Sequence, residues 1–260
     1  MLNLTHIDTA CALLEIGGWR LVTDPVFDAP GGRYHFGWGA LSRKQSTPAL
    51  RPDQLGPIDA VLLSHHQHGD NLDAGGAAFA RSAPVVVTTR AAARTLSNAI
   101  GLAPGDTHVL TAPGRSDLHI TAVHAQHRPA FMPEFISGPV IGFVLRSDVL
   151  PSGAVYITGD TVLCDAVRAA VATHKVHTLV VHVGAVRFPW LTGPLRYTFN
   201  ATEAAEVAHL SGAANVVPIH TSGWTHFREG IPALLAACET KGVASRLRVP
   251  VSGERLTVSV

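Results

Sequence analysis

The sequence predicts an α/β protein in which mixed β-sheets are covered by helices. Segments rich in Val, Ile and Leu come first as a run of short strands, and they later alternate with segments of helical length. The 24 glycines and 17 prolines are spread along the chain, which favours many short turns over a bundle of long helices. With 260 residues, 47% of them apolar, the chain can bury a substantial core. We therefore expect a single domain over residues 1–260.

The first part of the chain is expected to form strands joined by short connections. Gly17-Gly18 is typical of a tight hairpin turn. Residues 28–57 are rich in Gly, Pro and aromatic residues and show little periodicity, so we expect a long loop of the kind that often lines a pocket. The expected strands cover residues 2–4, 10–16, 19–23 and 58–63.

Beyond residue 73, helices and further strands are expected to alternate. Asn200 or Thr202, close to Glu203, resembles a capping box at the start of a helix. The expected helices cover 74–81, 91–100, 163–173, a segment that begins at residue 202, and 231–241. The expected strands cover 85–88, 107–110, 118–124, 141–146, 155–158, 178–183, 216–219, 247–251 and 256–260.

Composition narrows the class of partner. A formal net charge of +1 gives no reason to expect binding to nucleic acid or to an anionic membrane surface. No apolar run approaches the roughly 18 residues that span a bilayer, and residues 1–6 lack the pattern of a signal peptide. Three cysteines, far apart in the sequence, argue against a disulfide framework. We expect a cytoplasmic protein that acts on a small molecule. The oligomeric state stays open, with a homo-oligomer among the options.

A polar cluster directly follows the expected strand over 58–63. Its ten residues read Ser64-His65-His66-Gln67-His68-Gly69-Asp70-Asn71-Leu72-Asp73. Imidazole nitrogens mixed with carboxylate oxygens form the ligand set that zinc and other borderline divalent metals prefer. A polar turn that happens to be rich in histidine is the less favoured interpretation. The end of a buried strand is also a suitable place for a site, because the sheet holds the side chains still.

Three later strands also end in a histidine or an aspartate. His127 follows the strand over 118–124, Asp160 follows 155–158, and His220 follows 216–219. A lone histidine at a strand end is usually structural. Strand ends on one edge of a sheet converge, however, so four of them in one chain favour a shared metal site.

The order His-x-His-x-Asp, then His, then Gly-Asp-Thr, then Pro-Ile-His resembles the metallo-β-lactamase-fold metal-dependent hydrolases. The opening, with Thr23-Asp24-Pro25, is similar to the branch that includes N-acyl-phosphatidylethanolamine phospholipase D and L-ascorbate-6-phosphate lactonase. The resemblance covers about residues 4 to 230. It implies a four-layer αβ/βα sandwich of two mixed β-sheets flanked by helices, with a metal site at one edge.

The resemblance also implies ligands, which we carry over by residue. His66, His68 and His127 match the first metal site, with Zn²⁺ as the expected cofactor and Mn²⁺ or Fe as alternatives. His65 is a departure from the pattern, because either His65 or His66 could be the first ligand. We expect both rings to lie within reach of the ion.

The second site matches Asp70 and His220, and Asp160 matches the carboxylate that bridges both ions. Asn71 stands where the family usually has a histidine, and an amide oxygen binds zinc more weakly than an imidazole does. Both one and two ions are therefore open, and the second ion could require bound substrate. Asp24 either caps the turn before its proline or orients a metal-bound histidine.

Three residues near the implied edge complete the expected site. His226 could donate a proton to the leaving group, and Trp224 could form an aromatic wall for the substrate. His182 could contact the substrate. His182 and His226 could equally serve only to hydrogen-bond ligands or backbone.

These residues together predict metal-dependent hydrolysis of a small ester, phosphodiester or lactone. A bound metal lowers the pKa of water from near 16 to about 7, and Asp70 is expected to orient that water. Two alternatives belong to other classes: an iron-containing redox enzyme on the same fold, and a lapsed enzyme that binds a metal or ligand without turnover.

Overall fold

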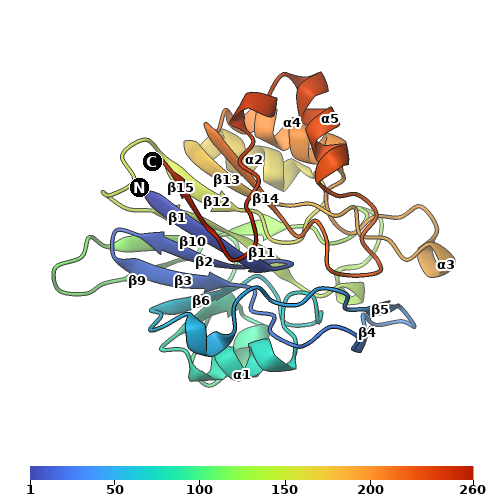
Figure 1. Cartoon of the computed structure of the whole chain (residues 1–260), viewed down its shortest axis with the longest axis horizontal. Coiled ribbons are helices and arrows are strands. Elements are labelled where there is room, and N and C mark those ends of the chain that lie inside the picture. The colour runs from blue at the N-terminus through green and yellow to red at the C-terminus, as the bar shows by residue number, and fades with distance from the viewer. Residues whose placement is uncertain (260) are drawn as a thin grey trace.

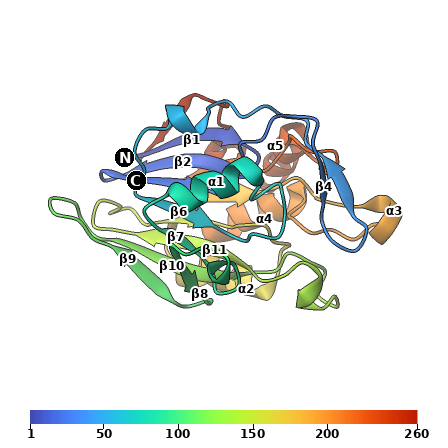
Figure 2. The same cartoon turned by 90° about the horizontal axis from the view of Figure 1, so that it is seen from below.

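Two β-sheets pack face to face and helices cover their outer sides (Figures 1 and 2). The structure is a computed structural model that describes residues 1–259. Helix α1 (Ala74–Ser82) lies against the first sheet, whereas α2 (Asp165–Thr173), α4 (Ala201–Ser211) and α5 (Ile231–Lys241) cover the second. The predicted α/β class, a sandwich of two mixed sheets flanked by helices, is confirmed.

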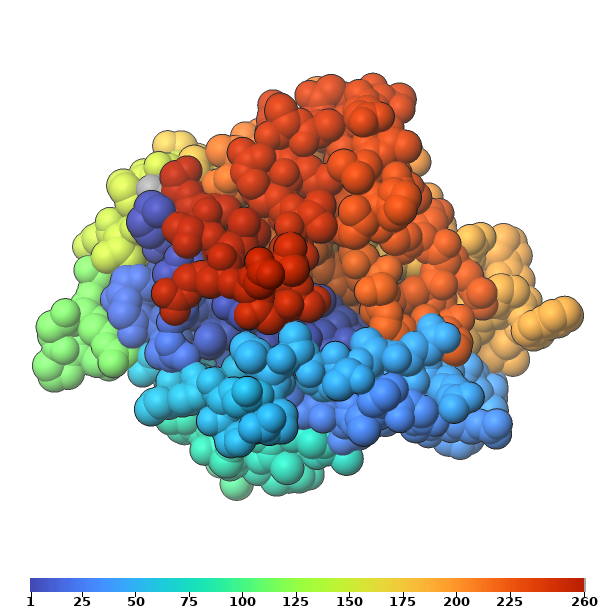
Figure 3. All heavy atoms as spheres, viewed as in Figure 1, coloured from blue at the N-terminus to red at the C-terminus, as the bar shows by residue number. Residues whose placement is uncertain are grey.

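The first sheet has seven strands in the order β15-β1-β2-β3-β6-β7-β8. Its four strands from β15 to β3 pair antiparallel, and those from β3 to β8 pair parallel. Pairing of β1 with β15 brings the two ends of the chain together, which the blue and red residues of Figure 3 make visible. The strands are β1 (Leu2–Asp8), β2 (Cys11–Ile16), β3 (Trp19–Thr23), β6 (Ala60–Leu63), β7 (Val86–Thr89), β8 (Ala99–Leu102) and β15 (Arg255–Val258).

The second sheet has six strands in the order β14-β13-β12-β11-β10-β9. The strands from β12 to β14 are parallel, and the others are antiparallel. A capping box starts α4, where Asn200 Oδ1 accepts from the backbone N–H of Glu203 at 2.8 Å. The strands are β9 (Thr107–Leu110), β10 (Leu118–Ala125), β11 (Val140–Arg146), β12 (Ala154–Ile157), β13 (Val176–His182) and β14 (Asn215–Ile219).

The main core lies between the two sheets. Leu14 and Leu62 from the first sheet pack with Ile120 and Phe143 from the second. Each such side chain contributes about 1.5–3 kcal/mol by leaving water. The other face of β6, with Leu63, is buried against the helix side of the sheet. Because β6 is buried on both faces, it fixes the point at which the chain enters the polar cluster.

The predicted helix over 91–100 is wrong. Only the 3₁₀ helix η2 (Ala92–Arg94) forms, and the chain then enters β8, which pairs parallel with β7. Asn98 Nδ2 donates to the carbonyls of Ala80 and Ala83 near the end of α1, at 2.9 and 2.8 Å. These tertiary hydrogen bonds and the strand pairing override the helical preference of the alanines.

The predicted strand over 247–251 is also wrong. Only an isolated bridge joins Val216 and Leu247, and Pro250 lacks the N–H that a strand ladder needs. The chain crosses from the second sheet to the first here, after the 3₁₀ helix η4 (Ala244–Arg246), and forms β15. Residue 260, the expected end of the last strand, lies outside the described residues.

The expected loop over 28–57 contains a short hairpin of β4 (Arg33–His35) and β5 (Leu41–Arg43), followed by the 3₁₀ helix η1 (Pro52–Gln54).

A single domain over residues 1–260 stays a prediction. Among the described residues, no helix combines the length and apolar character needed to cross a membrane.

Candidate metal centre

Four strand ends meet at one edge of the sandwich, as the sequence predicts. The chain leaves β6 at Ser64, β10 shortly before His127, β12 shortly before Asp160, and β14 at His220. The polar side chains that follow form two groups, each with ligand atoms within 4.8 Å of one another. We call His65, His68 and His127 the three-histidine group, and Asp70, Asp160 and His220 the aspartate–histidine group. All six residues are buried.

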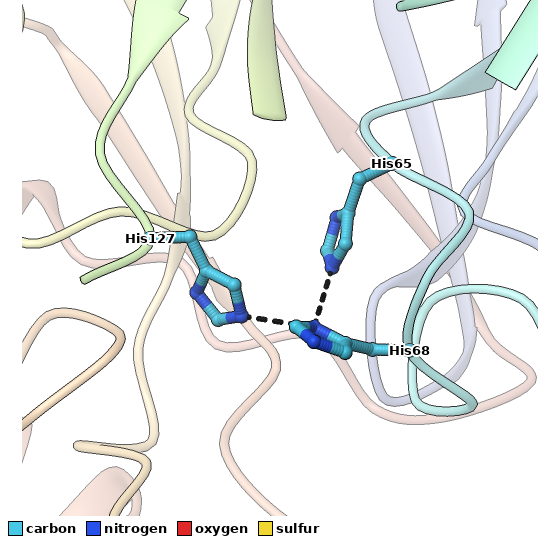
Figure 4. A group of neighbouring side chains, drawn as sticks. All are labelled: His65, His68 and His127. Atoms are coloured by element: carbon cyan, nitrogen blue, oxygen red, sulfur yellow. Dashed lines mark hydrogen bonds between the residues drawn. The ribbon is translucent and has the colours of Figure 1, made fainter. Parts of the chain in front are cut away.

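In the three-histidine group, three imidazoles converge on a common point (Figure 4). Nε2 of His65 and Nε2 of His127 each lie 3.0 Å from Nδ1 of His68. Nδ1–H of His127 donates to the carbonyl of Tyr197 at 2.7 Å, which leaves the lone pair of its Nε2 directed at His68. Nitrogen lone pairs arranged in this way suit a bound cation.

Burial keeps the three imidazoles neutral. It lowers the pKa of His65 well below its ordinary value, that of His68 to about 4 and that of His127 to about 3. The His68 and His127 rings also disfavour a charge on His65, and the His68 ring disfavours one on His127. Neutral imidazoles are the form that binds metals, so the group can bind a cation at pH 7 without releasing protons.

In the aspartate–histidine group, Nε2 of His220 lies 3.4 Å from Asp70 Oδ2 and 3.5 Å from Asp160 Oδ2. Burial opposes the ionisation of Asp70, but the adjacent His220 ring and the hydrogen bond with His226 outweigh it and hold the pKa of Asp70 well below the usual range. Burial raises the pKa of Asp160. Burial also disfavours a charged His220, but the two carboxylates outweigh this and raise its pKa to about 9. The φ angle of His220 is +58°, a strained conformation of the kind that clusters at functional sites.

Buried atoms without a hydrogen-bond partner support the fit of this group to a cation. Among the described residues, Asp160 Oδ1 and His220 Nε2 are buried and have no such partner. An unpaired buried polar atom is costly, and a divalent cation would satisfy both atoms. The two groups therefore fit a metal centre with two positions.

His66 belongs to neither group, so the expectation that His65 and His66 both lie within reach is corrected. Successive side chains that leave a strand point to opposite sides. His65 points inward, where Ser64 Oγ lies 2.9 Å from its Nδ1, and His66 is left half-buried outside. Asp24 Oδ1 accepts from the backbone N–H of Ser64 at 2.7 Å and so holds the backbone at the residue before His65. Burial raises the pKa of Asp24 to about 7.

His182 lies behind the aspartate–histidine group and not in contact with a substrate space. It is fully buried, with Nδ1 3.3 Å from Thr158 Oγ1 and Nε2 3.5 Å from Asp24 Oδ2. As the last residue of β13, it faces into the sandwich. Burial lowers its pKa to about 3. The geometry favours the structural interpretation of His182.

His226 and Trp224 both lie near the site, but in different roles. Nε2 of His226 is 3.0 Å from Asp70 Oδ2, and its Nδ1 hydrogen-bonds Ser42 Oγ. Trp224 is buried, donates from Nε1 to Thr9 Oγ1 at 3.1 Å, and packs on Phe36. Trp224 therefore supports the wall of the site from behind and does not form its surface.

A cavity of about 220 Å³ opens above the two groups, with His68, Asp70 and His127 on its floor. The hairpin of β4 and β5 and the helix α3 (Pro189–Thr192) lie at this same end of the molecule (Figures 1 and 2). The sequence does not predict the individual wall residues. It predicts only that the aromatic-rich loop over residues 28–57 lines a pocket. The principal wall residues are Phe36, Trp38, Met132, Ile136, Phe188 and Leu191.

Fold and site define the class as the metallo-β-lactamase fold with a candidate two-position metal centre. The chain belongs to the family described as the beta-lactamase superfamily domain, whose family model matches residues 19–221. The predicted resemblance is thus confirmed at the level of the family. Curated relatives from Mycobacterium bovis and Mycobacterium tuberculosis, both named as uncharacterised proteins, are 29% identical over 264 residues. The match covers 94% of this chain and 66% of theirs.

Solved structures share the fold at low sequence identity. The isothiocyanate hydrolase from Delia radicum gut bacteria has a TM-score of 0.80 and 19% identity, with 99% of each chain covered. A possible metal-dependent hydrolase from Veillonella parvula also has a TM-score of 0.80, at 18% identity, covering 99% of this chain and all of the other. The diiron β-hydroxylase CmlA from Streptomyces venezuelae has a TM-score of 0.63 at 15% identity, covering all of this chain and 54% of CmlA.

Proposed function

We propose that this protein is a metal-dependent hydrolase, with zinc in at least the three-histidine group. The observation that carries the proposal is the position of His68, Asp70 and His127, which belong to the two ligand groups and also form the floor of the cavity. A divalent metal bound there supplies Lewis acidity and an activated water at neutral pH. A substrate in the cavity would lie directly against that centre.

The cavity favours an uncharged substrate with an apolar substituent. Its walls are aromatic and aliphatic, and Asp70 is the one Asp, Glu, Lys or Arg among the described residues that line it. A phosphodiester would find no Lys or Arg among the described wall residues and only the metal centre to balance its charge, so an ester or a lactone fits these walls better. An isothiocyanate, which the name of one structural neighbour gives as its substrate, is also small and uncharged. It belongs in the same set of candidates.

The chain's own residues supply positioning and proton transfer. Asp70 holds its carboxylate on the cavity floor, where it can accept a hydrogen bond from the attacking water. His226 bonds to Asp70 on one side and Ser42 on the other, so the Asp70–His226 pair can take up the proton of the water, and Asp70, which lines the cavity, can return that proton to the leaving group. The ring of Phe188 stacks on that of His226 at 5.3 Å and shields this path from water.

The experiment compares two neighbouring histidines. Wild type, His65→Ala and His66→Ala are purified without added metal, and each is assayed for metal content and for hydrolysis of esters, lactones, phosphodiesters and isothiocyanates. We expect His65→Ala to lose zinc and activity and His66→Ala to keep both. Equal losses in the two variants would contradict the ligand assignment. Metal-loaded wild type that cleaves nothing in the panel would contradict the hydrolase proposal and favour a lapsed enzyme.

Iron-dependent redox chemistry is the second candidate, because three imidazoles suit iron as well as zinc. The structural neighbour CmlA is named as a diiron enzyme. Iron in the purified protein, together with consumption of oxygen, would favour this candidate.

A further inference from the structure

Asn71 touches both carboxylates of the aspartate–histidine group, although an amide is an unusual neighbour for two acids. Its side chain is fully buried. One terminal atom of the amide lies 3.2 Å from Asp70 Oδ1 and 3.2 Å from Asp160 Oδ2. With no ion among these atoms, this terminal atom is best assigned as the nitrogen, which donates to both carboxylates, with the oxygen on the other side toward Ser64 Oγ.

The two orientations of the amide have different requirements. With the nitrogen toward the carboxylates, Asn71 donates to both of them and needs no ion. With the oxygen toward them, three oxygen atoms with no proton between them converge in a buried site, which is unfavourable unless a cation lies among them. The unpartnered His220 Nε2 faces the same two carboxylates, at 3.4 and 3.5 Å from Oδ2 of each.

We propose that Asn71 Oδ1 is a direct ligand of the second metal position. The position then has three oxygen donors, from Asn71, Asp70 and Asp160, and one nitrogen donor from His220. This inference rests on the proposed metal-dependent function and adds the chemical class of the second ion. Asn71 is thus a working ligand and not a sign of a weakened site.

The donor set indicates which cation this position selects. Carboxylate and amide oxygens suit harder cations such as Mn²⁺, whereas imidazoles suit zinc. The two aspartates also balance the charge of a divalent ion in a buried site. The three-histidine group offers three nitrogen donors, with Asp160 Oδ2 3.9 Å from His127 Nε2, and is expected to take Zn²⁺. Zn²⁺ in the three-histidine group and Mn²⁺ at the second position is therefore the expected loading.

The test loads metal-free protein with one equivalent of Zn²⁺ and then titrates Mn²⁺, following bound Mn²⁺ by electron paramagnetic resonance and both metals by elemental analysis. Wild type is expected to bind about one further ion. Asn71→Leu, of similar size but without a donor, should weaken Mn²⁺ binding about 100-fold or more, and Asn71→Asp should keep it. Asn71→His should shift the relative affinity at the second position toward Zn²⁺ by at least about tenfold.

Retained zinc in the three-histidine group shows that each variant is folded, so a loss confined to Mn²⁺ reports on the second position alone. Unchanged Mn²⁺ affinity in Asn71→Leu, or an unchanged preference in Asn71→His, would overturn the inference. Wild type that holds zinc but no second ion would overturn it and leave the proposed function standing. Wild type that holds no metal at all would overturn both.

Discussion

Replacing Lys44 by Met should lower the free energy of unfolding by about 3–5 kcal/mol, because it removes the cation from a buried ionic cluster. Nζ of Lys44 lies 3.0 Å from Asp73 Oδ2 and 3.1 Å from Asp8 Oδ2, and all three side chains are at most 2% exposed. Each pair attracts by roughly 5 kcal/mol at an effective dielectric constant of about 20. Most of this attraction offsets the free-energy cost of removing the Lys44 ammonium group from water. Without Lys44, both carboxylates stay buried with no cation to balance their negative charge.

The variant is measured by urea unfolding at pH 7, with intrinsic fluorescence and circular dichroism as two probes. Arg51→Ala is the matched control, because its ion pair with Asp53 is about 70% exposed and screened by solvent, so its loss should leave the urea midpoint nearly unchanged. Lys44 also ties the loop that carries Phe36 to β1 and α1, so the KM for an apolar substrate should rise. A loss of less than 1 kcal/mol in Lys44→Met would refute the reasoning.

Three further predictions concern the site. Phe188→Ala should raise the KM for apolar substrates by about 10- to 100-fold, because the lost ring contacts contribute about 1.5–3 kcal/mol; steady-state kinetics with an unchanged KM would contradict this. His226→Gln should lower kcat by about 100-fold or more with metal content unchanged, and an unchanged kcat would exclude proton transfer through this ring. The metal-free protein should lose stability as the pH falls from about 6.5 toward 4. The folded-state pKa values of His68 and His127, about 4 and 3, lie below the unfolded value of 6.5, so the unfolded state binds more protons in this window. Buried Asp24 and Asp160, whose pKa values are raised, act in the opposite sense but are fewer than the buried imidazoles, so a urea midpoint that stays level or rises between pH 7 and 4.5 would contradict this expectation.

The positions of most candidate ligands could be predicted because they follow from sheet geometry. His127, Asp160 and His220 lie far apart in sequence, yet each follows a strand, and neighbouring strands that end at one edge bring such residues together. An apolar run that stops at a polar residue is visible in the sequence. The fold class was predictable for the same reason, since the runs and their alternation with helices reflect burial.

Which of His65 and His66 belongs to the three-histidine group could not be predicted, because it depends on the backbone conformation directly after β6. The contact of Asp24 with the backbone N–H of Ser64 holds the backbone at the residue before His65. That contact joins residues 40 positions apart, and no spacing within the cluster encodes it. The motif therefore predicts which types of ligand atom are present, but which of two adjacent histidines contributes its ring depends on backbone contacts with residues far away in the sequence.

Nearness in sequence to a ligand was a poor guide to the cavity wall. Trp224 follows His220 by four residues but packs behind Phe36, and His182 ends a strand but faces the interior. The cavity wall instead comes from the β4–β5 hairpin, the η3 (Glu134–Ile136) region and the α3 region, where apolar residues follow no helix or strand period. Apolar residues without a regular period are typical of a loop that covers a binding site and does not pack into the core. Candidate ligands held by strand ends can therefore be predicted from the local sequence pattern, but the substrate class depends on how separate loops pack and has to come from the three-dimensional structure.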